Sequence, residues 1–321
     1  MTPNAGSPRK RRRSFAATGS IPPLGKSRSQ PSTRAGYLAK SGCPRPKVRG
    51  RSLGELRREF LFQRFLALIF STPNGQWVLK GGAGLLMRLA EARFSKDLDL
   101  LHLGEVTPDQ AIAELRSLTA ARDGDHLTFI VENGVAYSRT NPVVEISVTA
   151  YIGARYDSFP IDLARELHLL AAPERIRPTP VVHVPGLTEL PEVVVYPLSD
   201  QVADKVCAMF ELYGERANPS SRYRDLIDLA LIVSTCDLDA VPVSQALLSE
   251  SKRRVMKLPE QMVSPGPQWP SGYAAYARKT KIDESLHALE AAIEHVGRCV
   301  NPLLSGARST GRWHPGVGWS D

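Results

Sequence analysis

The sequence predicts an α/β (α+β) protein, in which a core with a mixed sheet precedes an all-helical C-terminal lobe. Between residues 76 and 163, short runs rich in Val, Ile and Leu alternate with helical patterns. From residue 200 to 300 the apolar residues recur almost throughout at helical spacing. The 321 residues, 42% of them hydrophobic, suffice for a buried core in one large or two modest domains. We expect a core over 52–199, a helical domain over 200–300 and a loose tail over 301–321.

Residues 1–51 differ in composition from the rest of the chain. They contain thirteen Lys or Arg and no Asp or Glu. The formal net charge of the whole chain is +8, but 28 basic and 33 acidic residues remain after residue 51, so that part carries 28 − 33 = −5. We expect a disordered basic tail, which is either an electrostatic anchor for RNA or DNA or a solvated extension without a specific partner.

Cysteine usage and hydropathy restrict the cellular setting. The four cysteines lie far apart without a CxxC pair, which gives no signal for a zinc site or a disulfide framework. No apolar run reaches the ~18 to 20 residues needed to cross a bilayer, and the N-terminus lacks a signal-peptide pattern. We therefore expect a cytoplasmic protein that does not bind a membrane.

A first helix is expected to begin after an N-cap at Ser52 and to end at the turn signal Pro73-Asn74-Gly75. A short strand then leads into Gly81-Gly82. The elements expected around these glycines are a strand over 76–79, a helix over about 83–92 and a strand over 97–101.

The remaining core elements follow the same patterns. A helix is expected over 108–121 after Thr107-Pro108, and Gly153-Ala154-Arg155 is the expected hairpin turn. Strands are expected over 127–131, 143–152 and 158–163. The proline-rich segment 173–197 indicates edge strands and loops. In the helical half we expect helices over 200–213, 222–236, 242–257, 272–277 and 282–300.

The pattern that carries chemistry joins these glycines to Asp97-Leu98-Asp99. Two carboxylates two residues apart on a strand point to the same face, which suits two oxygen ligands on one hard cation such as Mg²⁺. Gly81 and Gly82 remove side chains where a strand turns into a helix, so that backbone N–H groups can approach a phosphate. Lys80 or Ser95 would add further donors.

Nucleotidyl transfer needs such a set, because Mg²⁺ neutralises the triphosphate and aligns the leaving pyrophosphate. A third carboxylate commonly completes the cluster, and Asp162 is the first choice, with Glu145 the second. A glycine pair or an Asp-x-Asp alone is more often a turn or a solvated strand edge, but their combination favours function. No Ser or Cys lies in a nucleophile-elbow sequence, which argues against hydrolases.

A second cluster lies in the helical half. Asp204-Lys205 is expected within one helix, and Asp225 and Asp228, three residues apart, share a face of the next helix. In one interpretation they form a surface ion-pair network that holds two helices together. In the other, Lys205 contacts the triphosphate and Asp225 lies near the reacting groups. Taken alone, the cluster favours the ion pairs.

Together these motifs resemble the AbiEii-type nucleotidyltransferases, which are toxins of AbiE and mycobacterial MenAT toxin–antitoxin systems and members of the DNA polymerase β-like superfamily. The resemblance covers roughly residues 53 to 298 and keeps the order of the motifs. The matching segments are Val78-Leu79-Lys80-Gly81-Gly82, Ser95-Lys96-Asp97-Leu98-Asp99-Leu100, Asp204-Lys205 and Arg222-Tyr223-Arg224-Asp225-Leu226-Ile227-Asp228-Leu229. The superfamily often has Gly-Ser where this chain has Gly81-Gly82, and the basic tail is not part of the family pattern.

The resemblance implies a nucleotidyltransferase core, a helical lobe and a cleft between them. It implies that Asp97 and Asp99 bind Mg²⁺, that Lys205 binds the nucleotide phosphates, and that Asp225 is an essential acid near the acceptor. The implied substrates are an NTP and the 3′ end of tRNA, and the implied partner is a cognate antitoxin. Two alternatives stay open, namely nucleotidylation of a small molecule or protein, and a non-enzymatic nucleic-acid-binding protein.

Overall fold

The computed structural model describes residues 51–72, 75–120, 126–136, 143–164 and 169–321, all within one compact unit. The expected basic tail lies outside the described residues except for Arg51. The guanidinium of Arg51 pairs with Glu59 and donates to the carbonyl oxygens of Ala90 and Ala92 at 2.8 Å each. Arg51 therefore belongs to the folded part of the chain.

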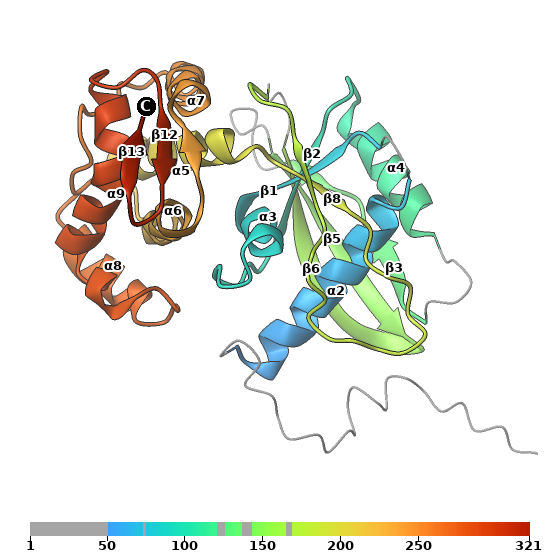
Figure 1. Ribbon diagram of the computed structural model, residues 1–321. Coiled ribbons are helices and arrows are strands. Elements are labelled where there is room, and N and C mark those ends of the chain that lie inside the picture. The colour runs from blue at the N-terminus through green and yellow to red at the C-terminus, as the bar shows by residue number, and fades with distance from the viewer. Residues whose placement is uncertain (1–50, 73–74, 121–125, 137–142, 165–168) are drawn as a thin grey trace, which may run out of the picture. The chain divides into compact units, whose positions relative to one another are not determined.

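The N-terminal half contains the expected mixed sheet (Figure 1). Its strands run in the order β3-β5-β6-β2-β1-β8-β7, and β4 also pairs with β5. The pairs β2–β6 and β1–β8 are parallel, and the other pairs are antiparallel. The strands are β1 (Trp77–Lys80), β2 (Leu98–His102), β3 (Thr128–Val131), β4 (Val135–Ala136), β5 (Val143–Ile152), β6 (Ala154–Ala164), β7 (Glu174–Ile176) and β8 (Val193–Val195).

Among the described residues, three helices accompany this sheet: α2 (Leu53–Ile69), α3 (Gly81–Arg88) and α4 (Pro108–Thr119). Helix α2 begins with a capping box, because the Ser52 hydroxyl accepts from the backbone of Glu55 while the Glu55 side chain accepts from the backbone of Ser52. Two α2 phenylalanines pack edge-on against Phe159 of β6, with ring centroids 5.0 and 5.5 Å away. The apolar face of α2 is thereby buried on the sheet.

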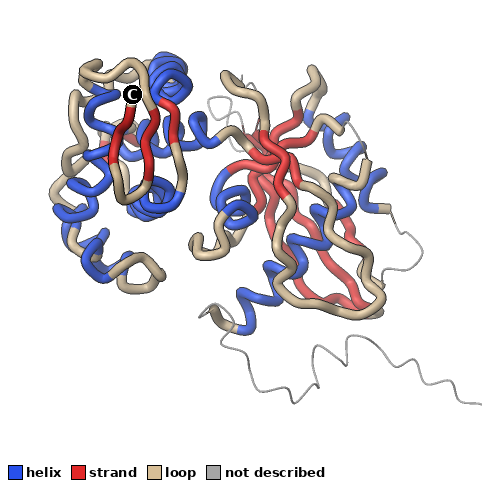
Figure 2. The backbone as a smooth tube through the Cα atoms, viewed as in Figure 1, coloured by secondary structure: helices blue, strands red, loops and turns tan. Residues whose placement is uncertain are grey.

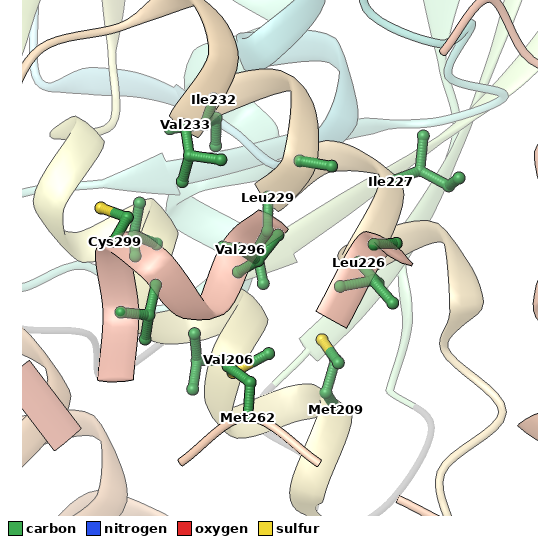
Figure 3. Packing of buried hydrophobic residues seen from close by; sticks show 14 of the residues in the cluster. Val206, Met209, Leu226, Ile227, Leu229, Ile232, Val233, Met262, Val296 and Cys299 are labelled. Atoms are coloured by element: carbon green, nitrogen blue, oxygen red, sulfur yellow. The ribbon is translucent and has the colours of Figure 1, made fainter. Parts of the chain in front are cut away.

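The C-terminal half is built mainly from helices around one core (Figure 3). The helices are α5 (Leu198–Phe210), α6 (Tyr223–Thr235), α7 (Ala240–Arg253), α8 (Trp269–Ala277), the short 3₁₀ helix η2 (Glu284–Leu286) and α9 (Leu289–Leu304). Val206 of α5, Leu229 of α6 and Val296 of α9 are fully buried in this core. Leu85 and Leu86 of α3 belong to the same cluster, so the core continues into the first half of the chain.

The expected loose tail after residue 300 is ordered in the structure. Helix α9 continues to Leu304, and two short strands follow, β12 (Arg312–His314) and β13 (Gly318–Ser320), which join β11 (Leu238–Asp239) in a three-stranded sheet (Figure 2). Trp313 donates to the carbonyl of Val233 at 2.9 Å, and Trp319 donates to that of Cys299 at 3.1 Å. One buried and one half-buried indole order this segment, which is too short to show a periodic pattern. Together with the hairpin of β9 (Leu212–Tyr213) and β10 (Asn218–Pro219), these strands correct the expectation of an all-helical lobe.

Other boundaries differ in ways that concern the site. Helix α3 begins at Gly81 and ends at Arg88, and β2 begins at Leu98, so Asp97 directly precedes the strand. Strand β8 lies between β1 and β7 and is not an edge strand. The helix expected over 282–300 is divided into η2 and α9. Among the described helices, none combines the length and apolar character needed to span a membrane.

Candidate active site

The glycine bend, Gly81-Gly82, lies against the carboxylate of Asp99. Gly81 has a φ of +60°, which favours glycine, and a Cβ built at this residue would lie 1.8 Å from Oδ2 of Asp99. The strand register explains the contact, because Lys80 at the end of β1 pairs with Asp99 of β2. The expected meeting of the bend and Asp99 at the start of α3 is therefore present in the structure.

Three carboxylates form a row across neighbouring strands, which we call the acid row: Asp99, Asp162 and Glu145. Asp99 of β2 pairs in register with Asp162 of β6, which pairs in turn with Glu145 of β5. Side chains at paired positions lie on the same face of a sheet. Both candidates for the third carboxylate, Asp162 and Glu145, therefore share the face of Asp99, and all three are half-buried.

Burial and nearby negative charges raise the pKa values of two of these acids. Burial, and next the charge of Asp97, raise the pKa of Asp99 to about 6, while Lys80 opposes the increase. Burial raises the pKa of Asp162 as well, followed by the charges of Asp97 and Glu145. A cation placed among these carboxylates would offset the repulsion. Among the described residues, no three acidic, His or Cys side chains lie close enough as they stand to form a metal site, so the Mg²⁺ ligands remain a prediction.

Two of the expected phosphate donors have partners within the protein. The buried hydroxyl of Ser95 donates to Oδ1 of Asp97 at 2.7 Å, so Ser95 orients this carboxylate. Nζ of Lys80 lies 4.5 Å from the ring centroid of Tyr196, a cation–π contact. Their contact with phosphate remains a prediction.

Helix α5 brings residues from the second half to the glycine bend. The side chain of Gln201 donates to the carbonyl oxygen of Gly81 at 2.9 Å. One turn further, burial raises the pKa of Asp204, but Lys80 and Arg254 outweigh it and lower that pKa to about 2. An ion pair of 2.6 Å joins Arg254 to Asp204. The sequence patterns assign no role to Gln201 or Asp204. Gln201 lies four residues before Lys205 and Asp204 lies one residue before it, and this spacing on one helix is the signal that could have indicated a role.

Lys205 and Asp225 meet in a second group of charges, which we call the ion-pair network: Arg93, Lys205, Arg222, Asp225 and Asp228. Nζ of Lys205 lies 2.5 Å from Oδ2 of Asp228 and 3.4 Å from Oδ1 of Asp225. Nε of Arg222 lies 2.6 Å from Oδ2 of Asp225, and Nη2 of Arg93 lies 3.0 Å from Oδ2 of Asp228. The structure thus contains the ion pairs between two helices that the sequence favoured, but Lys205, Asp225 and Asp228 are buried, not at the surface. The catalytic roles of Lys205 and Asp225 remain predictions.

The family model described as "Nucleotidyl transferase AbiEii toxin, Type IV TA system" matches residues 64–295. The solved structure of the nucleotidyltransferase toxin MenT4 from Mycobacterium tuberculosis H37Rv is similar, with a TM-score of 0.52 and 19% identity over 80% of this chain and 86% of MenT4. For JHP933 from Helicobacter pylori the TM-score is 0.43, with 16% identity over 80% of this chain and 94% of JHP933. No curated protein matches the chain.

At 19% identity the MenT4 structure shows a shared fold, and the family model carries the assignment. Its match extends from helix α2 to helix α9 and includes the glycine bend, Asp97, the acid row and the ion-pair network. The match spans well over half of the 321 residues. The chain therefore belongs to the AbiEii family of nucleotidyl transferase toxins of type IV toxin–antitoxin systems, and it is a nucleotidyltransferase.

Proposed function

We propose that the protein transfers the nucleoside monophosphate of an NTP to the 3′ end of tRNA in a Mg²⁺-dependent reaction that blocks translation in the cytoplasm. The contact between Asp99 and Gly81 supports this most directly. The Asp99 carboxylate occupies the space that a Cβ would take, so the glycine bend and the acid row adjoin each other. A phosphate bound at the bend would lie beside carboxylates that can hold its counterion.

Asp97, Asp99 and Asp162 would hold Mg²⁺, with Glu145 as the alternative to Asp162. Their chemistry fits the ion, because Mg²⁺ prefers oxygen ligands, and burial followed by like charges raises the pKa of both Asp99 and Asp162. When bound, Mg²⁺ would neutralise the triphosphate and help pyrophosphate to leave.

The other side chains would bind and orient the substrates. The backbone N–H groups of Gly81 and Gly82, at the start of α3, would bind phosphate together with Lys80. Ser95 holds Asp97 through its hydrogen bond. Lys205 would bind the triphosphate and Asp225 would be the acid near the acceptor hydroxyl, both held in place by the ion-pair network.

The acceptor is the least constrained part of the proposal. Transfer to a small molecule or a protein side chain would use the same bend and acid row. The alternative of a non-enzymatic nucleic-acid-binding protein is excluded, because the chain belongs to a family of enzymes.

A labelling experiment separates the acceptors. Purified protein is incubated with each α-³²P-labelled NTP and Mg²⁺, with and without total tRNA. We expect label in tRNA, which EDTA and Asp99→Asn abolish, while Glu294→Gln, a change at an exposed residue of α9, retains the activity. Label only in protein or in a small molecule would contradict the tRNA assignment, and no label under any condition would contradict nucleotidyl transfer.

Expression in cells tests the toxin function. We expect the wild-type chain to arrest growth and Asp99→Asn to be harmless at the same protein level. Co-expression of the protein encoded in the neighbouring reading frame should restore growth if that protein is the antitoxin. Equal growth with the wild type and the variant would argue against toxicity through this site.

A further inference from the structure

Arg93 lies in the loop before β2, between the two halves of the candidate site. Its side chain is only 11% exposed, and Nη2 pairs with Oδ2 of Asp228 at 3.0 Å. Nε of Arg93 is buried and has no hydrogen-bond partner among the described residues. A guanidinium has five N–H donors, so the pair with Asp228 leaves donors for a second anion.

Gly82 brings this guanidinium to the first turn of α3. A Cβ built at Gly82 would lie 3.1 and 3.3 Å from Nη2 and Nη1 of Arg93, and 2.9 Å from Oγ of Ser95. A side chain at this position would push Arg93 or Ser95 aside. The second glycine of the bend therefore allows a close approach to a cation, at the place where the proposed function puts the phosphates.

The ion-pair network has an unequal number of charges. Arg93, Lys205 and Arg222 are three cations, and Asp225 and Asp228 are two carboxylates, which leaves 3 − 2 = +1. Arg93 and Lys205 share one oxygen of Asp228. Its other oxygen, Oδ1, is buried and has no partner within the part of the chain that the structure describes. Asp228 thus holds two cations side by side. An anion that contacts both would give a further partner to two cations that share a single carboxylate oxygen.

We propose that Arg93 is a further phosphate-binding residue of the site, and that Asp228 positions its guanidinium over Gly82, next to Lys205. The ligand class is a chain of phosphates such as the triphosphate of an NTP. The inference rests on the proposed function, which places the nucleotide at the glycine bend. Arg93 contacts the phosphates directly, and Asp228 is a positioning residue.

The test uses inorganic tripolyphosphate as the probe, because its phosphate chain is common to every NTP, and calorimetry in the presence of Mg²⁺ measures the affinity. Arg93→Gln removes the charge, and Arg88→Gln is the matched control. Arg88 is similarly buried, at 12% exposed, pairs with Glu174 and also has an unpartnered Nε. We expect Arg93→Gln to weaken binding roughly tenfold or more, as for a lost hydrogen bond between charged groups.

The controls decide between binding and folding. Arg88→Gln should stay within about twofold of the wild type. Arg93→Lys should give an intermediate affinity, because it restores the charge without the planar fork. This variant also keeps the test informative if Arg93→Gln does not fold. Unchanged affinity in Arg93→Gln, or equal losses in Arg93→Gln and Arg88→Gln, would overturn the inference.

The same proteins separate this inference from the proposed function. If the wild type labels tRNA but Arg93→Gln binds tripolyphosphate as tightly as the wild type, the inference about Arg93 alone is wrong. If the wild type labels no RNA but binds tripolyphosphate through Arg93, the proposed acceptor is wrong and Arg93 remains a phosphate-binding residue.

Discussion

The acid row and the ion-pair network are both groups of charges, but their electrostatics are opposite. In the acid row, burial and neighbouring carboxylates raise the pKa of Asp99 and Asp162. In the network, burial also raises the pKa of Asp225, but Lys205 and Arg222 outweigh it and lower that pKa. Carboxylates that repel one another disfavour the folded state and favour a bound cation. Carboxylates paired with cations hold the fold together, so the acid row favours a bound cation, whereas the carboxylates of the network stabilise the fold and position its cations.

The largest effect on stability is expected from the network. Asp225→Ala leaves Lys205 and Arg222 without one of their partners, and loss of one member of a buried pair costs about 3 to 5 kcal/mol. Glu294→Ala breaks the exposed pair with Arg298 and should cost under about 1 kcal/mol. Urea unfolding of both variants measures the difference. Similar small losses in both would show that the network does not support the fold.

The contact at the glycine bend should control activity. Gly81→Ala forces a Cβ onto the Asp99 carboxylate, and we expect at least about a hundredfold loss of nucleotidyl transfer, since even residues behind metal ligands cost 10- to 100-fold. Gly153 is the matched control: it has a φ of +71°, but a Cβ there meets nothing within 4 Å. Gly153→Ala should lose about 1 to 2 kcal/mol of stability and keep its activity. Equal activity in the two variants would show that the contact between Gly81 and Asp99 does not control nucleotidyl transfer.

Removal of the charge of Asp99 should increase the stability of the folded protein. Its pKa is about 6 in the folded protein and near 4 when unfolded, so its contribution to stability is lost as pH rises from 4 through 6. In EDTA at pH 7.5, Asp99→Asn should therefore be more stable by about 1 to 3 kcal/mol, with little gain at pH 4. Thermal unfolding at both pH values measures this. A variant less stable than the wild type at pH 7.5 would contradict the raised pKa of Asp99.

The smallest effect is expected at Ser95. Ser95→Ala removes the hydrogen bond that orients Asp97, worth about 0.5 to 1.5 kcal/mol, so nucleotidyl transfer should fall roughly three- to tenfold. Ser234→Ala removes a hydroxyl bonded to the carbonyl of Ala230 and should leave activity unchanged. A loss as large as that of Gly81→Ala would instead indicate that Ser95 contacts the substrate.

Local patterns in the sequence predict most of the elements. The capping box at Ser52 marks the start of α2, and the apolar run Val143–Ile152 is strand β5 with its turn at Gly153. These features depend on residues close in sequence. The ordered segment after α9 depends instead on two indoles that find partners in α6 and α9, which no local pattern contains.

The candidate site also contains residues that local sequence patterns predict and residues that depend on distant partners. The glycine bend and the two aspartates near β2 are visible in the sequence because they lie within twenty residues of one another. The choice between Asp162 and Glu145 needed the register of β2, β6 and β5, and the register places both in the same row. Local patterns could not predict the roles of Gln201 and Arg93, because their partners, Gly81 and Asp228, are more than a hundred residues away.

Helix α5 contacts both the glycine bend and the ion-pair network within little more than one turn. Gln201 donates to the carbonyl oxygen of Gly81, and Lys205 pairs with Asp228. A hinge cannot lie between these two residues without breaking the regular hydrogen bonds of the helix. Any opening motion that separates the sheet from the helices must therefore disrupt the bond from Gln201 to Gly81 or the pair of Arg93 with Asp228. An opening motion therefore requires that at least one of these two contacts breaks. A pair of spin labels or fluorophores, one on the sheet and one on the helices, would measure the change in distance.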